Sequence, residues 1–411
     1  MNADNGPDRT ARMERERTVA TDVYWLMTGP RVFSDSVARA IGKHRWLAIH
    51  TPTFTMPGFA TALERALERA HLDNEEARWV KVNEQQEVAT LIGTLYQVAT
   101  FQPLQLAQAQ STIRTIVLQP TSETAMNQCK QYLQAFAEST AQLQRARGQL
   151  SLVAILPETL DAAREPIAST SQEMLFSGAL TPHEMQAYVA VRMGDRSGPG
   201  QTDLFRMLVT EFAGYDAQLA EELIGFSDEA LLELPRSLQW SSSQGDSRWR
   251  TGRWSAGCYA DIGGKRQRHV LYELYLSQHA GPDQRDASEW LKRRYWRACL
   301  RSLLPWLEER RARVIDVLRA PLEHHLKRTG GKAIRPTLSG APVETEIDDL
   351  EYNQISGMVL NDGFKVSGTR LTLAVNVCFA AKRVRDSMAH MRAPEAGKIL
   401  ELNDLMERLL P

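Results

Sequence analysis

The sequence predicts a parallel α/β domain in the N-terminal half, a helical middle part and an all-α bundle at the C-terminus. Short apolar runs alternate with longer amphipathic segments over residues 45–156, which is the pattern of repeated βαβ units. From residue 180 onward most apolar residues recur at helical spacing. Apolar residues make up 43% of the 411 residues, enough to build cores for two or three domains.

The first half supplies four candidate strands and three candidate helices. The strands are continuous apolar runs, which are typical of strands buried on both faces of a parallel sheet. They are expected at residues 45–50, 79–82, 115–118 and 150–156. Helical patterns separate them at residues 60–70, 84–99 and 122–146.

The first strand of such a sheet often leads into a phosphate-binding loop, and this sequence lacks one. The residues after it, TPTFTMPGF, do not contain the GxxxxGK[ST] pattern that directs backbone N–H groups and a lysine at phosphates. The third strand ends in Gln119 and Pro120, where an aspartate would be needed to hold magnesium. In its order of elements this half resembles an AAA or STAND-type ATPase core. The resemblance implies a domain that has lost its nucleotide chemistry and binds no cofactor; the alternative is an unrelated α/β scaffold.

The helical middle part begins with a clear start signal. Thr181 is a capping residue, Pro182 occupies the first helical position, and Glu184 is placed to hydrogen-bond back to the cap. After a glycine-rich loop over residues 193–203, further helices are expected at residues 204–212, 216–224 and 227–234. A small helical bundle in this place resembles the lid of an ATPase.

Residues 236–269 interleave tryptophans with basic side chains. Such a mixture can form a nucleic-acid surface, because rings stack on bases and cations meet phosphates. The alternative is a short β-hairpin whose tryptophans pack inward, and we favour it because nothing places these side chains on one face. The residues are Trp240, Trp249, Trp254, Arg248, Arg250, Arg253, Lys265, Arg266 and Arg268.

The C-terminal part is expected to be a helical bundle. A helix over residues 286–304 ends before Pro305, which starts a new helix because proline disrupts a helix interior. A loop over residues 329–342 follows, and Thr345 with Asp348 forms a capping pattern for the next helix. A long helix then runs from Leu371 to the region of Pro394, and a last amphipathic helix follows it. The core stripe of the long helix is Val377, Ala381, Val384, Met388 and Met391.

Near the end of this long helix the sequence RDSMAH places Arg385, Asp386 and His390 together. With the upstream acidic segment EIDDL and the final helix, it resembles the HEPN superfamily of helical domains, whose signature is an arginine followed after four to six residues by a histidine. The resemblance implies a metal-independent endoribonuclease that forms a homodimer through the C-terminal domain and cleaves RNA. These side chains suit such chemistry, because imidazole can move a proton to or from a ribose oxygen and guanidinium can stabilise charge on phosphate.

We predict that Arg385 and His390 are catalytic, with Asp386 positioning them and Arg383 in support. On a regular helix Arg383, Asp386 and His390 share a face, whereas Arg385 and His390 stand about 140° apart. Arg385 can still serve across a two-fold interface, so the choice between the two arginines stays open. The alternative interpretation is a helix end whose cations suit the negative end of the helix dipole.

Composition limits the partners and the location. The net charge of −1 provides no global attraction to nucleic acid, so any basic surface must be local. Four scattered cysteines and the lack of an apolar run of about 18 residues favour a soluble, cytoplasmic protein without membrane contact. No metal site is expected either, since the adjacent His324 and His325 point about 100° apart on a helix.

These expectations divide the chain into five segments. They are a disordered arm over residues 1–18, an ATPase-like α/β domain without a Walker A loop over 19–165, a lid-like helical domain over 166–238, a basic and aromatic insert over 239–286, and a HEPN-like helical domain over 287–411. The function expected is a ribonuclease effector of a bacterial-type defence or toxin system, whose N-terminal half regulates the nuclease or binds a protein partner. The alternative is a non-catalytic adaptor subunit of a defence complex.

Overall fold

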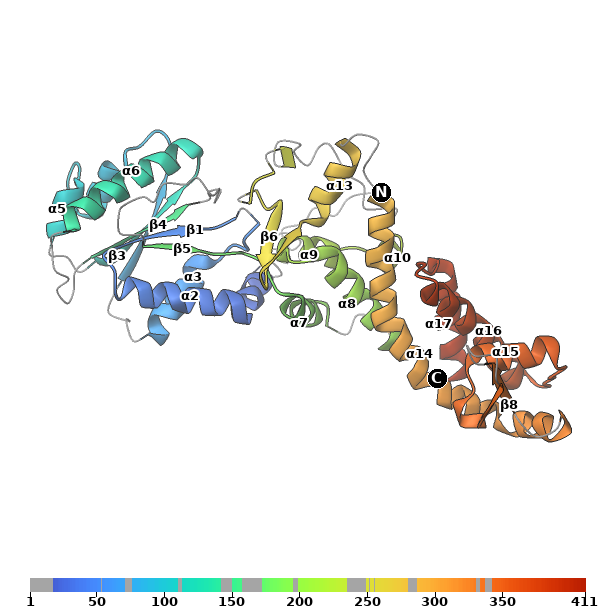
Figure 1. The fold of residues 1–411 in the computed structure, drawn as a ribbon. Coiled ribbons are helices and arrows are strands. Elements are labelled where there is room, and N and C mark those ends of the chain that lie inside the picture. The colour runs from blue at the N-terminus through green and yellow to red at the C-terminus, as the bar shows by residue number, and fades with distance from the viewer. Residues whose placement is uncertain are drawn as a thin grey trace, which may run out of the picture. The chain divides into compact units, whose positions relative to one another are not determined.

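The computed structural model divides the chain into two compact units (Figure 1). Unit 1 comprises Met1–Arg192, Ala213–Glu222 and Trp240–Leu276, and unit 2 comprises Met193–Phe212, Leu223–Gln239 and Ser277–Pro411. Residues 166–238, expected as one segment, are thus shared between the units. The structure describes residues 18–52, 54–70, 76–109, 113–141, 150–156, 172–194, 199–234, 249–250, 252–254, 256–279, 287–329, 333–336 and 342–411. The expected disordered arm lies outside these ranges except for residue 18.

Unit 1 is built on a parallel sheet of five strands in the order β2-β3-β4-β1-β5. Its strands are β1 (Trp46–His50), β2 (Glu76–Val82), β3 (Ile113–Pro120), β4 (Ser151–Leu156) and β5 (Glu173–Leu175). The four expected strands and their parallel arrangement are confirmed. The sequence did not reveal β5, because this edge strand is only three residues long and none of them is buried.

Helices cover both faces of this sheet, as the apolar strands require (Figure 1). α4 (Val88–Leu95), α5 (Pro103–Gln108) and α6 (Glu123–Thr140) share one buried core with strands β1 to β4. α2 (Thr28–Ile41) and α3 (Phe59–Arg69) pack together on the other side. The helix expected from residue 84 begins only at Val88, because the Asn83 side chain accepts the Gln85 N–H (3.1 Å) and holds a turn there.

Two other elements of unit 1, α7 and the hairpin, agree with the predictions from the sequence. α7 (Pro182–Met193) starts with the expected capping box, in which the Glu184 carboxylate accepts from the Thr181 N–H (2.9 Å). The interpretation of the aromatic insert as a hairpin is confirmed by β6 (Tyr259–Ile262) and β7 (Lys265–Arg268), which pair antiparallel. Trp249 and Trp254 are buried, and Trp240 lies outside the described residues. α9 (Ala217–Ile224) and α13 (Val270–His279) lie mostly in this unit.

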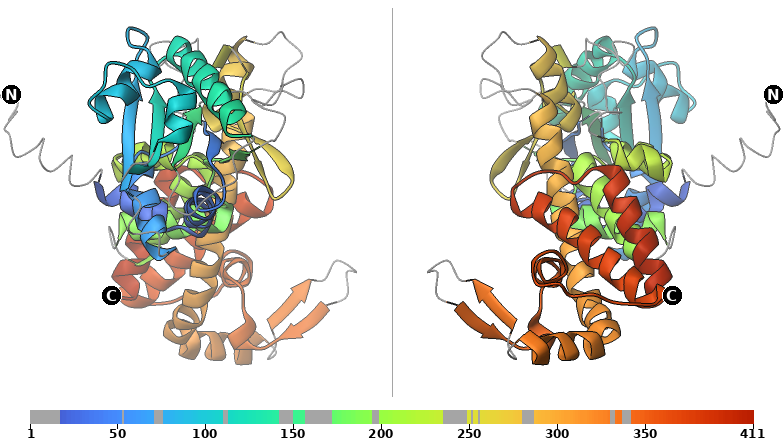
Figure 2. Two further views of the ribbon diagram at one scale, coloured as in Figure 1. Left: turned by 90° about the vertical axis from the view of Figure 1, so that its left-hand side faces the viewer. Right: turned by 90° about the vertical axis from the view of Figure 1, so that its right-hand side faces the viewer.

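Unit 2 is mainly helical (Figure 2). Its elements include α8 (Pro199–Ala213), α10 (Asp228–Leu232), α14 (Ala287–Thr329), α15 (Tyr352–Asn361), α16 (Thr369–Ala389) and α17 (Ala396–Leu409). α8 begins inside the loop expected over residues 193–203, with Pro199 in the first-turn position that favours proline. In the part of the chain that the structure describes, no helix has both the length and the apolar character needed to cross a bilayer.

The expected helix break at Pro305 is wrong. α14 continues through Pro305 and Pro321, and its later turns leave the direction of the earlier ones (Figures 1 and 2). An internal proline costs about 3 kcal/mol, whereas burying one large apolar side chain contributes about 1.5–3 kcal/mol. Leu303, Trp306 and Leu307 are all buried beside Pro305, so tertiary packing outweighs the local preference.

Two further expectations in this unit are wrong. The loop expected over residues 329–342 contains an antiparallel hairpin of β8 (Ala333–Pro336) and β9 (Pro342–Thr345). Thr345 therefore ends a strand and does not cap a helix. After a short 3-10 turn, α15 starts at Tyr352, because Glu351 and Gln354 satisfy each other's backbone groups in a reciprocal capping box.

The four cysteines are expected to be unreactive in the folded protein. All four are free and buried, and burial raises the pKa of Cys129, Cys299 and Cys378 to about 12. At pH 8 only about 10⁻⁴ of such thiols are ionised to the reactive thiolate. A colorimetric thiol reagent should titrate none of the four natively and all four in denaturant. Rapid native labelling of any cysteine would contradict this burial.

Candidate functional site at the end of helix α16

α16 carries the RDSMAH sequence on its last turns, and its buried face holds it within unit 2. Val377, Ala381, Val384 and Met388 are buried, which confirms most of the expected core stripe. Met391 does not continue that stripe, because its side chain is 77% exposed. The reason is that the helix ends at Ala389, well before Pro394.

A left-handed turn ends α16. Met391 has a φ of 56°, a conformation that side chains other than glycine rarely adopt. The Met391 N–H donates to the Met388 carbonyl (3.1 Å) and the Arg392 N–H donates to the Ser387 carbonyl (2.9 Å), the hydrogen-bond pair of a Schellman motif. The Trp296 indole N–H of α14 also donates to the Met388 carbonyl (2.8 Å). His390 is thereby placed at the helix cap.

The two predicted arginines are both held by carboxylates. Arg385, half-buried, bonds Glu351 on the approach to α15 (2.9 Å) and lies 3.7 Å from Glu308 of α14. Arg383, which is more exposed, bonds Glu401 of α17 (2.7 Å). The two side chains therefore face different helices. The upstream carboxylate that bonds Arg385 is Glu351, which directly follows the EIDDL segment.

Asp386 and His390 have a different environment. Both are exposed, and within the described ranges neither side chain takes part in a hydrogen bond or ion pair. Their link is through the backbone, since the His390 N–H donates to the Asp386 carbonyl (3.1 Å). The structure thus places an accessible imidazole at the end of α16 while Arg383 and Arg385 are engaged elsewhere.

A cavity of about 1160 Å³ opens beside this helix end, within unit 2. Its walls come from α10, α14, the turn after His390 and the first turn of α17. The lining residues are Leu232, Glu233, Glu289, Lys292, Arg293, Tyr295, Trp296, Arg297 and residues 391–397. The turn that ends α16 is therefore also one wall of the cavity.

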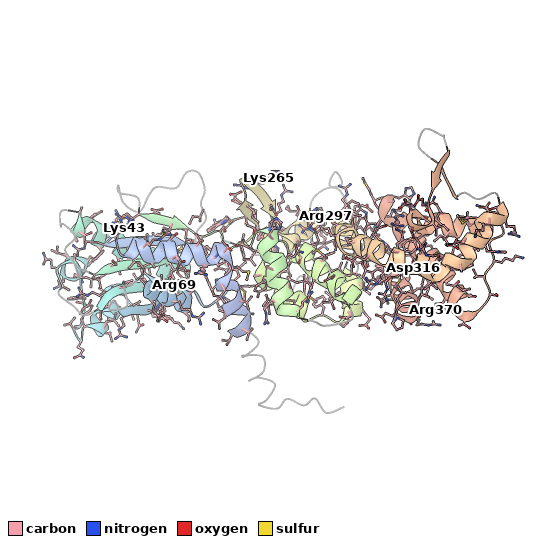
Figure 3. The ribbon with its side chains drawn as sticks, turned by 90° about the horizontal axis from the view of Figure 1, so that it is seen from below. Lys43, Arg69, Lys265, Arg297, Asp316 and Arg370 are labelled. Atoms are coloured by element: carbon pink, nitrogen blue, oxygen red, sulfur yellow. The ribbon has the colours of Figure 1, made fainter. Side chains whose placement is uncertain are left out.

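Most cations of α14 near the cavity have carboxylate partners. Lys292 bonds Glu289 (2.8 Å), and Arg297, marked in Figure 3, bonds Glu211 of α8 (2.9 Å). Arg293 is exposed, and the described part of the chain offers it no ion pair. The same holds for Arg392 on the opposite wall.

Sequence reasoning missed Arg293 and Arg392 as candidate site residues. Arg392 lies only two positions after His390, which was the one available signal. Its position depends on the left-handed conformation of Met391, and a methionine gives no hint of that. Arg293 belongs to a helix far away in the sequence, so only the fold brings it to the same cavity.

The loop after β1, where a nucleotide phosphate would be expected, is packed by side chains of unit 1. The Trp25 indole N–H donates to the Pro57 carbonyl (2.7 Å), and the Gln218 amide donates to the Thr55 carbonyl (3.0 Å). Gly58 adopts φ 89° and approaches Thr21 so closely that a Cβ would lie 2.2 Å from its methyl group. These contacts leave the loop as a packed connection, in agreement with its missing phosphate-binding pattern.

A buried histidine and aspartate in unit 1 are structural. His269 Nε2 lies 2.9 Å from Asp216, and its Nδ1 accepts the Leu271 N–H (3.1 Å). Asp216 also accepts the Gln218 and Leu219 N–H groups at the start of α9. Both ring nitrogens are used in fixing the chain, so neither remains for proton transfer. No group of three or more metal-ligating side chains occurs among the described residues.

Replacing Met391 with glycine should stabilise unit 2. A side chain in the left-handed conformation costs about 1 kcal/mol, which glycine avoids, and the exposed Met391 side chain loses little packing. The free energy of unfolding from urea titration of the transition that includes unit 2 should rise by about 1 kcal/mol. The neighbouring Ala389→Gly is the control, since Ala389 is helical and the same change there should destabilise by about 0.5–1 kcal/mol. Equal losses in both variants would contradict strain at Met391.

Two comparisons of the sequence with known proteins give no match. No family model matches the sequence, and no curated protein matches it. The case for a function therefore rests on the side chains at the end of α16 and on the cavity beside them.

Proposed function

We propose that this protein is a metal-independent endoribonuclease of the HEPN type, with His390 as its proton-transfer group. The observation that carries the proposal is the exposed imidazole at the end of α16, one residue before the turn that lines the cavity with Arg392. An imidazole used for catalysis must reach substrate, and one used for packing would be buried or hydrogen-bonded. Among the described residues His390 is neither.

The reaction uses the ribose 2′-OH as the nucleophile. Its oxygen attacks phosphorus, the bond from phosphorus to the 5′-oxygen breaks, and the products are a 2′,3′-cyclic phosphate and a 5′-hydroxyl. One imidazole takes the proton from the 2′-OH, and a second gives a proton to the leaving 5′-oxygen. Each chain offers one histidine in the motif, so a homodimer through the C-terminal domain supplies the pair. Asp386, exposed beside His390, positions the imidazole once RNA is bound.

Three arginines could supply the stabilising cation in this proposal. Arg385, predicted as catalytic, must exchange Glu351 for the phosphate, and Arg383 must similarly leave Glu401. Arg392 needs no such exchange. A guanidinium hydrogen-bonded to both non-bridging oxygens stabilises the charge that develops during attack.

The N-terminal half is proposed as an ATPase-like regulatory domain that binds no nucleotide and contacts a protein partner in a bacterial defence or toxin system. The parallel order β5-β1-β4-β3-β2, with β1 between β4 and β5, supports the resemblance to AAA and STAND ATPase cores. The packed loop after β1 supports the loss of nucleotide binding. Such a domain would inhibit the nuclease until the protein partner binds to the N-terminal half.

A second candidate function is a non-catalytic adaptor subunit. The ion pairs of Arg383 and Arg385 favour it, because they give both motif arginines a structural role without RNA. In this alternative the end of α16 is a surface for another protein, and neither motif arginine leaves its carboxylate.

Cleavage of RNA in EDTA tests the two candidates. The purified chain, incubated with single-stranded and structured RNA, should produce fragments with 2′,3′-cyclic phosphate ends. His390→Ala should lower the rate by about 10²- to 10⁴-fold, because it removes the general acid or base. The exposed His324 of α14, replaced in the same way, is the matched control and should leave the rate unchanged.

Arg385→Ala separates a catalytic arginine from a structural one. If Arg385→Ala cleaves RNA at the wild-type rate but is less stable, Arg385 has a structural role through its ion pairs with Glu351 and Glu308. Equal inactivity of wild type and His390→Ala, with the expected partner present, would favour the adaptor. A chain that stays monomeric in sedimentation experiments with RNA bound would contradict the proposed two-fold site.

The protein should not bind ATP with micromolar affinity. The loop after β1 has no phosphate-binding pattern, and side chains of unit 1 hydrogen-bond to its carbonyls at Thr55 and Pro57. Titration calorimetry with Mg-ATP should show no binding at protein concentrations of tens of micromolar. A dissociation constant in the low micromolar range would overturn the assignment of this half as nucleotide-free.

A further inference from the structure

The β6-β7 hairpin of unit 1 has one packed face and one open face. Two glycines, Gly263 and Gly264, connect its strands, and both have a positive φ (58° and 74°), as a tight type I′ turn requires. Ala260 is buried in a small core with Phe54 and Tyr215, so the face that carries Ala260 is the inner one. Successive residues of a strand alternate between its two faces, so the neighbours of Ala260 belong to the open face.

The open face carries two arginines in one row. Arg268 lies opposite Tyr259 in the register of the hairpin. Arg266 lies opposite Asp261, and both pairs alternate with the pair that contains the buried Ala260. Both arginines are exposed. The register thus places on one face two of the cations that the sequence pattern could not assign to a face.

The charge of this hairpin is positive and mostly uncompensated. Asp261 is the one carboxylate in residues 259–268, against three cations. Its contact with Arg266 is long (3.5 Å), and both side chains are at least 60% exposed, so an anion can displace it. Neither Arg268 nor Lys265, which directly follows the glycine turn, makes an ion pair within the described residues. In a chain with a net charge of −1 this local excess favours a polyanionic partner.

Two features of the row favour a strand of nucleic acid over other polyanions. Arg266 and Arg268 are two positions apart on β7, which is about 6.7 Å along a strand, close to the distance between consecutive phosphates of an extended nucleic-acid backbone. The Arg266 guanidinium lies 4.2 Å from the centroid of the Tyr259 ring, so a cation–π contact holds its plane. The side chain is still 64% exposed, and a supported guanidinium plane is a surface on which an unpaired base can stack.

We propose that the open face of the β6-β7 hairpin binds single-stranded nucleic acid. Consecutive phosphates accept hydrogen bonds from Arg266 and Arg268, Lys265 adds a third cation at the turn, and an unpaired base stacks on the Arg266 plane. A duplex offers no unpaired base, and neither does a membrane surface or an acidic protein. This inference goes beyond the proposed ribonuclease, because it concerns unit 1 and requires no cleavage.

Binding of a fluorescently labelled single-stranded DNA by the full chain tests the proposal. This probe has no 2′-OH and is therefore not a substrate of the proposed nuclease. At low salt the wild type should bind it with a Kd of about 10⁻⁶–10⁻⁴ M in fluorescence anisotropy, the range of binding through backbone contacts. Arg268→Glu should weaken binding about 10-fold or more, because a charge-assisted contact becomes a repulsion.

Lys265→Glu and Lys43→Glu are a matched pair of charge reversals. Both lysines are exposed, belong to unit 1 and make no ion pair within the described residues. Lys43 precedes β1, and Figure 3 shows it away from Lys265. Lys265→Glu should weaken binding about 3-fold or more, whereas Lys43→Glu should change it less than about 2-fold.

The salt dependence of binding separates a phosphate contact from a structural role. Arg268→Gln removes the charge without reversing it. The slope of the logarithm of the affinity against the logarithm of the salt concentration should become shallower by about 0.7, the value of one phosphate contact on a single strand. A loss of stability alone would leave that slope unchanged.

Three results would overturn the proposal. The first is binding that Arg268→Glu and Lys265→Glu weaken no more than Lys43→Glu does. The second is tighter binding of the duplex form of the same DNA, which would assign the face to a duplex. The third is tighter binding of polyglutamate, or of vesicles of phosphatidylcholine and phosphatidylserine, which would assign it to an acidic protein or to a membrane.

The outcome for the hairpin is independent of the outcome for the nuclease. If the wild type cleaves RNA through His390 while Arg268→Glu binds the DNA strand as tightly as the wild type, the ribonuclease stands and the hairpin is not a nucleic-acid site. If Arg268→Glu loses binding and the wild type does not cleave RNA, the hairpin site stands and the nuclease is wrong.

Discussion

The candidate site depends on the left-handed turn at Met391. This turn ends α16 at Ala389, makes His390 the cap, and carries the chain back across the helix end so that Arg392 lines the cavity. Glycine would adopt the conformation without strain, whereas methionine costs about 1 kcal/mol. Three hydrogen bonds hold it: two from the Schellman motif and one from Trp296 to the Met388 carbonyl. A strained residue kept at the wall of a cavity, with its side chain exposed, is an observation from which a functional hypothesis can properly start.

The charge of unit 2 is organised around a buried carboxylate on α8. Glu211 is 7% exposed and accepts from both Arg297 and Arg301, and Arg294 donates to the Glu211 carbonyl. A carboxylate this buried needs such partners, because an unpaired buried charge is strongly destabilising. Of the four arginines in the first half of α14, Arg294, Arg297 and Arg301 fasten the helix to α8, whereas Arg293 makes no ion pair within the described residues.

Local sequence patterns predicted where the helices and strands lie better than they predicted which residues contact one another in the folded protein. The four long strands were visible because each is an unbroken apolar run, and α7 was visible because Thr181 and Glu184 form its cap. The prediction of a helix break at Pro305 was wrong because it used only the local preference of proline. The burial of Leu303, Trp306 and Leu307 depends on tertiary packing, which the local sequence does not show. His390 was proposed as a site residue from its spacing in RDSMAH, and the structure places it, exposed, at the cap of α16. The environment of Arg385 was hidden, since Glu308 and Glu351 belong to other segments and only folding brings them to it.

The strength of those ion pairs decides how the motif can act. Arg383 and Glu401 are both about half exposed, and an exposed pair of this kind contributes at most about 1 kcal/mol. A phosphate can replace Glu401 at little cost. Arg385 is more buried and faces two carboxylates, Glu351 (2.9 Å) and Glu308 (3.7 Å), so releasing it breaks two ion pairs at once. The pair that is harder to open is thus the one at the arginine of the RDSMAH motif. A site of this kind is neutralised by its own carboxylates when empty, and it gains its catalytic cation only when a phosphate or a second chain displaces them.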